Sequence, residues 1–265
     1  MVALAATSRA EVTLRTTATA TVSERALVRL EVANAGDVSA ANVTPEVVYQ
    51  GRQVHGEPLA ELRPGDRHAW TFDLPLPTEP GTAPALIQVR YTDSTGHRTS
   101  VPAVATVVTP GLLAVLEARA TLTTTPVARF GEATVTIENP TPVPIHGRLI
   151  TVLPAGLTTE PESQPAEVPA QGSREFPIVV QNDGAARGST GSMFALFEYN
   201  LDGRWHLIVA PAGVTISTAS AAQSPLLVGA IALGLALALL AVAWRRAARR
   251  VANARNGPPG RTHKT

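Results

Sequence analysis

Short runs in which apolar and polar residues alternate fill the chain between residues 10 and 217. They are rich in β-branched residues and are separated by Gly, Pro, Asn and Asp, and none has the 3.6-residue period of an amphipathic helix. Many short strands spaced by turns favour antiparallel sandwiches over alternating strands and helices. The runs predict these strands: Val12–Val22, Ala26–Val32, Val43–Tyr49, His68–Leu74, Leu86–Tyr91, Val101–Val108, Leu116–Thr125, Thr134–Ile137, Arg148–Leu153, Arg174–Val180, Phe194–Tyr199 and Trp205–Ile216.

The two halves of this region share landmarks at a nearly constant spacing, which indicates an internal repeat. The offsets lie between about 105 and 109 residues. The matched landmarks are Leu30–Asn34 with Val135–Asn139, Pro64-Gly65 before Trp70 with Gln171-Gly172 before Phe176, and Tyr91 with Tyr199. We therefore expect an all-β body of two tandem immunoglobulin-like antiparallel sandwiches, at residues 11–109 and 112–216.

Several landmarks also predict local structure. Asn34 and Asn139 are expected to end a strand in a turn, because Asn tolerates left-handed backbone and caps its own main chain. Trp70 alternates with Phe72 and is expected in the core. Asp202-Gly203 between two strands predicts a two-residue hairpin.

The pattern V-x-L-x-V-x-N, then L-x-P-G, then an aromatic-ended strand before D-x-x-G resembles bacterial immunoglobulin-like folds of the cell-adhesion-related (CARDB-like) type. The resemblance covers about 200 residues. The second copy departs from it by lacking the Pro-Gly turn and by carrying Pro140, Pro142 and Pro144, which suggest an edge strand or a bent loop. The overall order of segments is similar to that of Gram-positive envelope proteins that bind peptidoglycan and a surface partner, although no motif matches them.

Leu226–Ala243 reads LLVGAIALGLALALLAVA and has no polar side chain. A helix of this length spans about 27 Å, close to the thickness of a bilayer's hydrocarbon core. Ser224-Pro225 supplies a helix start. We therefore expect a C-terminal transmembrane helix at 225–244, after a linker at 217–224. The residues expected in the membrane are Leu226, Ile231, Leu235, Leu239 and Trp244.

The charge pattern predicts how this helix is oriented. Residues 245–265 carry seven of the 22 Lys and Arg residues and none of the 21 acids, so the rest of the chain has a net charge of −6. Basic residues beside a span remain cytoplasmic, which leaves the body outside the cell and a basic tail at 245–265 inside. Arginines could also contact anionic lipid headgroups. The four arginines beside the span are Arg245, Arg246, Arg249 and Arg250.

An exported body needs a signal, yet Met1–Ala6 is too short for the apolar region of one. Residues 1–10 resemble the end of a signal peptide, which suggests that the true start lies upstream. The alternative is a tail-anchored protein with a cytosolic body, which the charge rule disfavours. Small residues at Ala230 and Gly234, or at Gly234 and Ala238, fit a face through which the helix could form a homo- or hetero-oligomer.

Candidate chemistry is sparse. The absence of cysteine excludes disulfides, thiol catalysis and Cys-based zinc sites. The six histidines form no HExxH pattern, and Gly188–Gly191 lacks the spacing of a nucleophile elbow. Asn182-Asp183-Gly184 and Leu153–Gly156 are interpreted as turns. The acidic body argues against nucleic-acid binding, and we expect no cofactor and no enzyme.

One surface is a candidate partner site. If Ala195 and Phe197 point inward and the Asp202-Gly203 turn pairs Asn200 with Trp205, an apolar stripe lies on the outer face. A register shifted by one residue would instead bury the whole set. The stripe consists of Phe194, Leu196, Trp205 and Leu207.

These observations favour a non-enzymatic, membrane-anchored extracytoplasmic binding or scaffold protein of the bacterial cell envelope. It would bind a surface protein or a cell-wall glycan through its sandwiches. The alternative is an accessory subunit of a membrane transport or secretion complex, docked through its helix.

Overall fold

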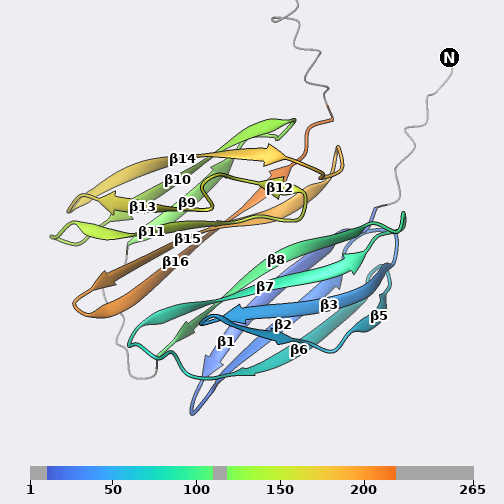
Figure 1. The fold of residues 1–265 in the computed structure, drawn as a ribbon, viewed down its shortest axis with the longest axis horizontal. Helices are drawn as coiled ribbons and strands as arrows, with labels where there is room; N and C mark the ends of the chain where they lie inside the picture. Colours follow the sequence, from blue (N-terminus) through green and yellow to red (C-terminus); the bar gives the residue numbers. More distant parts are fainter. Residues whose placement is uncertain (1–10, 110–117, 219–265) are drawn as a thin grey trace, which may run out of the picture. The chain divides into compact units, whose positions relative to one another are not determined.

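A computed structural model describes residues 11–109 and 118–218 of the chain (Figure 1). Those residues form antiparallel β-sheets and contain no helix. No helix in the described ranges is therefore long and apolar enough to cross a membrane. The predicted N-terminal segment at 1–10, the linker beyond residue 218, the span at 225–244 and the tail at 245–265 lie outside the described residues.

The first half of the chain forms a sandwich of two sheets. One sheet has the order β1-β2-β6; the other has the order β4-β3-β7-β8, with β5 also paired to β3. The sheet of β1, β2 and β6 thus faces the sheet that contains β3, β7 and β8, as in immunoglobulin-like sandwiches. The strands are β1 (Leu14–Val22), β2 (Ala26–Asn34), β3 (Ala40–Tyr49), β4 (Arg52–His55), β5 (Leu59–Leu62), β6 (Arg67–Leu74), β7 (Thr82–Thr92) and β8 (Arg98–Val108).

The second half repeats this arrangement. Its sheets have the orders β12-β14-β10-β9 and β13-β11-β15-β16. Thus β9, β10 and β14 correspond to β1, β2 and β6, and β13, β11, β15 and β16 correspond to β5, β3, β7 and β8. The strands are β9 (Arg119–Thr124), β10 (Phe130–Asn139), β11 (Ile145–Val152), β12 (Leu157–Thr158), β13 (Ser163–Val168), β14 (Gly172–Asn182), β15 (Thr190–Leu201) and β16 (Arg204–Thr215).

Alternation along the strands places apolar residues between the two sheets of each sandwich. In β2, Val28, Leu30 and Val32 are fully buried, whereas Arg29 is exposed. Each half has its own hydrophobic core, one drawn from residues 12–107 and the other from residues 118–216. Trp70 lies in the first core, as predicted, and its indole N–H donates to Glu57 O at 2.8 Å.

The asparagine landmarks are equivalent in three dimensions. Asn34 is buried, donates through Nδ2 to Val38 O and Leu62 O, and accepts at Oδ1 from the N–H of Gly36. Asn139 is also buried and donates to Val143 O and Pro169 O, and it accepts from the N–H of Thr141. Each asparagine therefore fixes the turn after its strand and adds a link to the opposite sheet. The predicted capping is confirmed, but neither asparagine has a positive φ.

All twelve predicted strands are present, and most are longer than predicted. Strands β1 and β9 are shorter, and residues 116 and 117 of the predicted Leu116–Thr125 strand lie outside the described residues. The Asp202-Gly203 hairpin is confirmed: Leu201 pairs with Arg204, and both turn residues have positive φ, as a type I′ turn requires. Pro140 and Pro142 lie in a bent connection between β10 and β11, one of the two predicted alternatives.

Candidate functional site

The apolar stripe on the β15–β16 hairpin lies on the predicted face. Asn200 pairs with Trp205, as expected from the two-residue turn. Ala195 and Phe197 belong to the second core, so the alternate residues Phe194 and Leu196 point away from it. The register is therefore not shifted by one residue.

The expected exposure of the stripe holds only in part. Trp205 is 39% exposed, but Leu196 is 0% and Leu207 is 7% exposed. Phe194 is half-buried. The two leucines are buried although neither belongs to a sandwich core. Because they are buried, Leu196 and Leu207 offer little surface to another molecule. The alternation of residues predicted the face on which they lie but could not reveal what covers that face.

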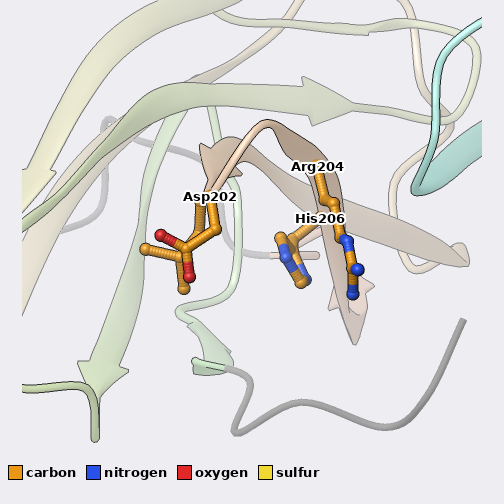
Figure 2. A pocket seen from close by; sticks show the side chains of 4 residues that line it. Asp202, Arg204 and His206 are labelled. Atoms are coloured by element: carbon orange, nitrogen blue, oxygen red, sulfur yellow. The ribbon is translucent and has the colours of Figure 1, made fainter.

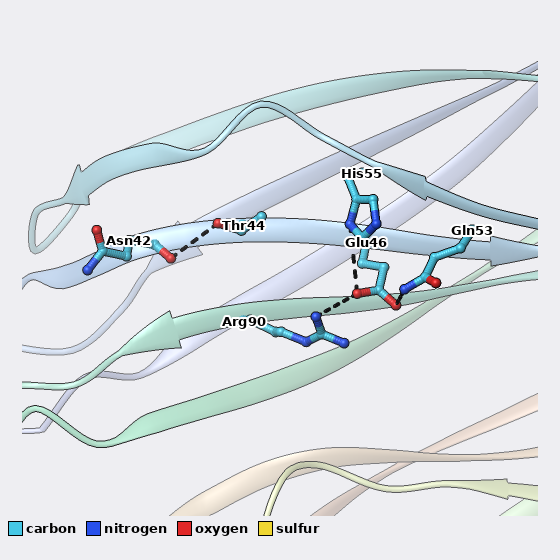
Figure 3. Close-up of polar contacts among 6 residues, drawn as sticks. All are labelled: Asn42, Thr44, Glu46, Gln53, His55 and Arg90. Atoms are coloured by element: carbon cyan, nitrogen blue, oxygen red, sulfur yellow. Dashed lines mark hydrogen bonds and ion pairs between the residues drawn. The ribbon is translucent and has the colours of Figure 1, made fainter.

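A polar cluster occupies the outer face of β3, β4 and β7 in the first sandwich (Figure 3). At its centre, the Glu46 side chain is only 8% exposed and forms an ion pair with Arg90, with 2.7 Å between Oε2 and the guanidinium nitrogen. Gln53 donates to the other carboxylate oxygen, and His55 Nδ1 lies 3.9 Å from Oε2. A buried carboxylate needs such partners to offset its lost hydration. Arg90 therefore neutralises Glu46.

Beside this cluster lies a cavity of about 520 Å³. The cavity is open to solvent rather than enclosed. Hydroxyl, amide and guanidinium groups predominate in its lining, and no carboxylate of the described residues lines it. The lining includes Asn42, Thr44, Arg90, Arg98, Ser100 and Ala155.

Strand pairing brings the two arginines of the cavity to neighbouring positions. Arg90 pairs with Ser100 across β7 and β8, and Arg98 lies two residues before Ser100 on the same face. Arg90 is committed to Glu46, whereas Arg98 has no ion-pair partner among the described residues. Arg98 therefore keeps its guanidinium donors free of an ion pair in this part of the structure. Guanidinium and hydroxyl donors suit carboxylate, phosphate or sugar hydroxyl groups.

The turn before Arg98 is ordered by Asp93. Its Oδ1 accepts hydrogen bonds from the N–H and hydroxyl of Thr95, at 2.8 and 2.7 Å, and from the N–H of His97 at 3.0 Å. Burial raises the pKa of Asp93, but the bonds from Thr95 and His97 outweigh it and bring the pKa below its usual value. The ionised carboxylate thus holds the loop from which Arg98 extends.

A smaller cavity of about 190 Å³ lies at the tip of the β15–β16 hairpin. Figure 2 shows Asp202, Arg204 and His206 around it; Leu201 completes the lining. His206 is buried and stacks on Tyr199, with 4.9 Å between ring centroids. This volume is below that of ordinary ligand sites, and the stacking gives His206 a role in packing.

Other sequence candidates have structural roles. Within the described ranges, no three His, Asp or Glu side chains come together as a metal site. Asn182 caps its own turn by accepting from the N–H groups of Gly184 and Ala185, as interpreted from the sequence. Leu153–Gly156 contributes Ala155 to the larger cavity through a turn. The predicted membrane and arginine residues between 226 and 250 lie outside the described residues.

Sequence reasoning missed the residues of the cavity and the cluster. Glu46 and Arg90 lie on outward-facing positions, where alternation indicates contact with water. The available signal was a cross-strand pair of opposite charge, but strand pairing had to be known to find it.

No protein-family model matches the chain, and a comparison with curated proteins found no similar sequence. The resemblance to cell-adhesion-related folds thus depends on the sequence landmarks.

The solved structures that are similar to this chain include the periplasmic chaperone SfaE and the Escherichia coli chaperone DraB. SfaE has a TM-score of 0.35 and 13% identity over 77% of this chain and 99% of its own. Escherichia coli DraB has a TM-score of 0.31 and 14% identity over 75% and 96%.

Red sea bream transglutaminase has a TM-score of 0.29 and 15% identity over 78% of this chain. This chain spans about a third of the transglutaminase (31%) and about a fifth of an E. coli alpha-2-macroglobulin (22%). At these values the likenesses carry no argument about activity or partners.

Proposed function

We propose that this chain is a non-enzymatic, membrane-anchored extracytoplasmic protein that binds a cell-wall glycan or a surface protein through its sandwiches. The observation that carries the proposal is the polar cavity of the first sandwich, lined by Arg98, which forms no ion pair with the described residues. Its donors and positive charge suit an acidic group on the ligand.

The sequence after residue 224 supports an anchor next to this binding body. Leu226–Ala243 is apolar throughout and ends at Trp244 and a cluster of arginines. An apolar stretch of this length followed by basic residues is typical of a span whose carboxyl end is cytoplasmic. The body would then face the envelope, where acidic glycans and surface proteins are available.

Reporter fusions test the anchor. We expect an alkaline phosphatase joined after residue 218 to be active and one joined after residue 265 to be inactive in cells, whereas a cytoplasmic reporter such as green fluorescent protein should give the reverse pattern. Full-length protein should remain with membranes in high salt and leave them only in detergent. An active phosphatase at residue 265 would overturn the orientation, and release by salt would overturn the anchor.

Retention of the protein on purified cell wall, with and without the acidic polymers of the wall, tests whether the cavity binds the ligand. Arg98→Glu should abolish retention because it replaces a donor with a charge that repels an acidic ligand. Arg15→Glu is the matched control, since Arg15 is exposed on β1 away from the cavity lining and should bind like the parent. Equal retention of both variants would exclude the cavity as the binding site.

The accessory-subunit alternative predicts a different result. Purification of the full chain in mild detergent would then recover an integral membrane protein in equal amount, and this recovery would not depend on Arg98. That outcome would replace glycan or surface-protein binding as the proposed function.

A further inference from the structure

The two buried leucines on the outer face of the β15–β16 hairpin need a cover. Leu196 and Leu207 are buried outside both cores. The strands that contact this hairpin from the other sandwich are β7, against β16, and β8, against β15. Both sandwiches belong to one compact unit of the chain, residues 1–218. The first sandwich therefore lies against the hairpin.

Hydrogen bonds from backbone and side chains join the same two regions at Trp205. The N–H of Trp205 donates to Pro80 O at 3.0 Å, and the hydroxyl of Thr82 donates to Trp205 O at 3.4 Å. The indole N–H of Trp205 also donates to the Glu79 carboxylate. Gly81 and Trp205 form an isolated parallel β-bridge. A second attachment, from Ala155 N–H to Ser100 O at 3.3 Å, lies between β8 and the loop before β12.

Gly81 is the residue that permits this approach. Its φ of +138° is a conformation that other residues rarely adopt. A Cβ atom at this position would lie 2.1 Å from Trp205 O and 2.6 Å from Trp205 N. Both are backbone atoms, so no side-chain rotation could relieve the clash. Only glycine fits here.

We propose that the outer face of the β15–β16 hairpin is the docking surface for the first sandwich, with residues 79–82 as a clasp around Trp205. The apolar stripe then has its partner within the chain, and the two sandwiches move as one body. Docking also brings Ala155 to the wall of the larger cavity, so the cavity is complete only in the docked arrangement.

The absence of cysteine gives a direct test, because two introduced cysteines can be spin-labelled without background. Thr71→Cys on β6 and Val179→Cys on β14 place one label on an exposed position of each sandwich. In the full chain in detergent, double electron–electron resonance should give a single narrow distance distribution. A broad distribution in this parent would overturn the proposal.

Gly81→Ala should abolish the narrow peak while each sandwich stays folded. The matched control is Gly96→Ala, which also places a Cβ atom at a positive φ (+83°) but has no atom within 4 Å of it, and it should keep the peak. If Gly81→Ala does not fold, Trp205→Ala replaces it, since it removes the indole contact and leaves the backbone unstrained. A narrow peak at the parent distance in the folded clasp variant would overturn the proposal.

Singly labelled samples distinguish docking within one chain from docking between two copies. We expect no dipolar signal from either single label at any protein concentration. A signal that grows with concentration would assign the hairpin face to a second copy and overturn docking within the chain.

Discussion

The turn after β2 and the turn after β10 contain the same buried asparagine but satisfy their other polar groups differently. In the first sandwich, the N–H of Ala35 donates to Thr13 O at 2.8 Å and that of Asp37 donates to Glu11 O at 3.2 Å. The segment before β1 thus lies against the turn. A Cβ atom on Gly36 would be 2.2 Å from Glu11 O, so glycine is required there.

Fewer backbone N–H groups need a hydrogen-bond partner in the second turn. Pro140 and Pro142 have no N–H to satisfy. The Thr141 hydroxyl lies 2.7 Å from Asn139 Oδ1 and 2.9 Å from Val143 O. The comparison teaches that the asparagine is the shared element of the repeat. Its surroundings can differ as long as each buried polar group has a partner.

The largest effect is expected from removing the shared asparagine. Asn34→Ala and Asn139→Ala should each lower the free energy of unfolding by about 2 to 4 kcal/mol, because two carbonyls and one N–H lose their partner. Urea denaturation of the full chain measures this loss. The exposed Asn200 is the control, and Asn200→Ala should change stability by less than about 0.5 kcal/mol. A small loss at only one of the two sites would show that the turns are not equivalent.

Equivalent tyrosines on β7 and β15 give the second prediction. Burial raises the pKa of Tyr91 to about 12, and the nearby Asp93 and Glu11 carboxylates act in the same direction. The phenol is protonated below pH 10 in both the folded and the unfolded state. Its contribution to the free energy of unfolding is therefore complete below pH 10 and is lost as the pH rises from 10 to 12. That loss is on the order of 2 kcal/mol.

Stability measured across this pH range should therefore fall less steeply for Tyr91→Phe than for the parent. Tyr199→Phe alters the equivalent residue of the second sandwich, whose hydroxyl accepts from Ala118 N–H at 3.3 Å, and it should retain the Tyr91 contribution. Parallel curves for Tyr91→Phe and the parent would contradict the assignment.

The sequence predicted the features that depend on local pattern. Alternation located twelve strands, constant spacing located Asn34 and Asn139, and the Asp202-Gly203 turn gave the pairing of Asn200 with Trp205. Strands β4, β5, β12 and β13 were missed because segments of two to six residues show too little alternation.

The remainder depends on contacts between distant segments. Alternation placed Leu196 on an outer face but could not indicate that another part of the chain buries it. Glu46 is likewise polar and outward-facing, and its burial follows from Arg90, Gln53 and His55 on neighbouring strands. Strand pairing between distant residues had to be known first.

The N-terminal packing of the first turn gives a smaller effect. Gly36→Ala should lower the free energy of unfolding by about 1.5 kcal/mol, because the new methyl group displaces the backbone of Glu11 and Thr13. Hydrogen exchange should also become faster at Ala35 and Asp37. Gly213→Ala is the control, since nothing lies within 4 Å of its new Cβ atom. Equal stability of the two variants would mean that residues 11–13 do not hold the turn.

The smallest effect is expected for the Thr141 hydroxyl. It occupies in the second turn the role that the packing of residues 11–13 has in the first. Thr141→Val keeps the volume but removes the donor near Asn139 Oδ1 and Val143 O, so we expect a loss of about 1 kcal/mol. Thr17→Val, at an exposed position on β1, should be neutral in the same urea titration. A loss of stability for Thr141→Val well below that for Gly36→Ala would indicate that Asn139 alone holds the second turn. The prolines of that turn leave few other backbone N–H groups that need a partner.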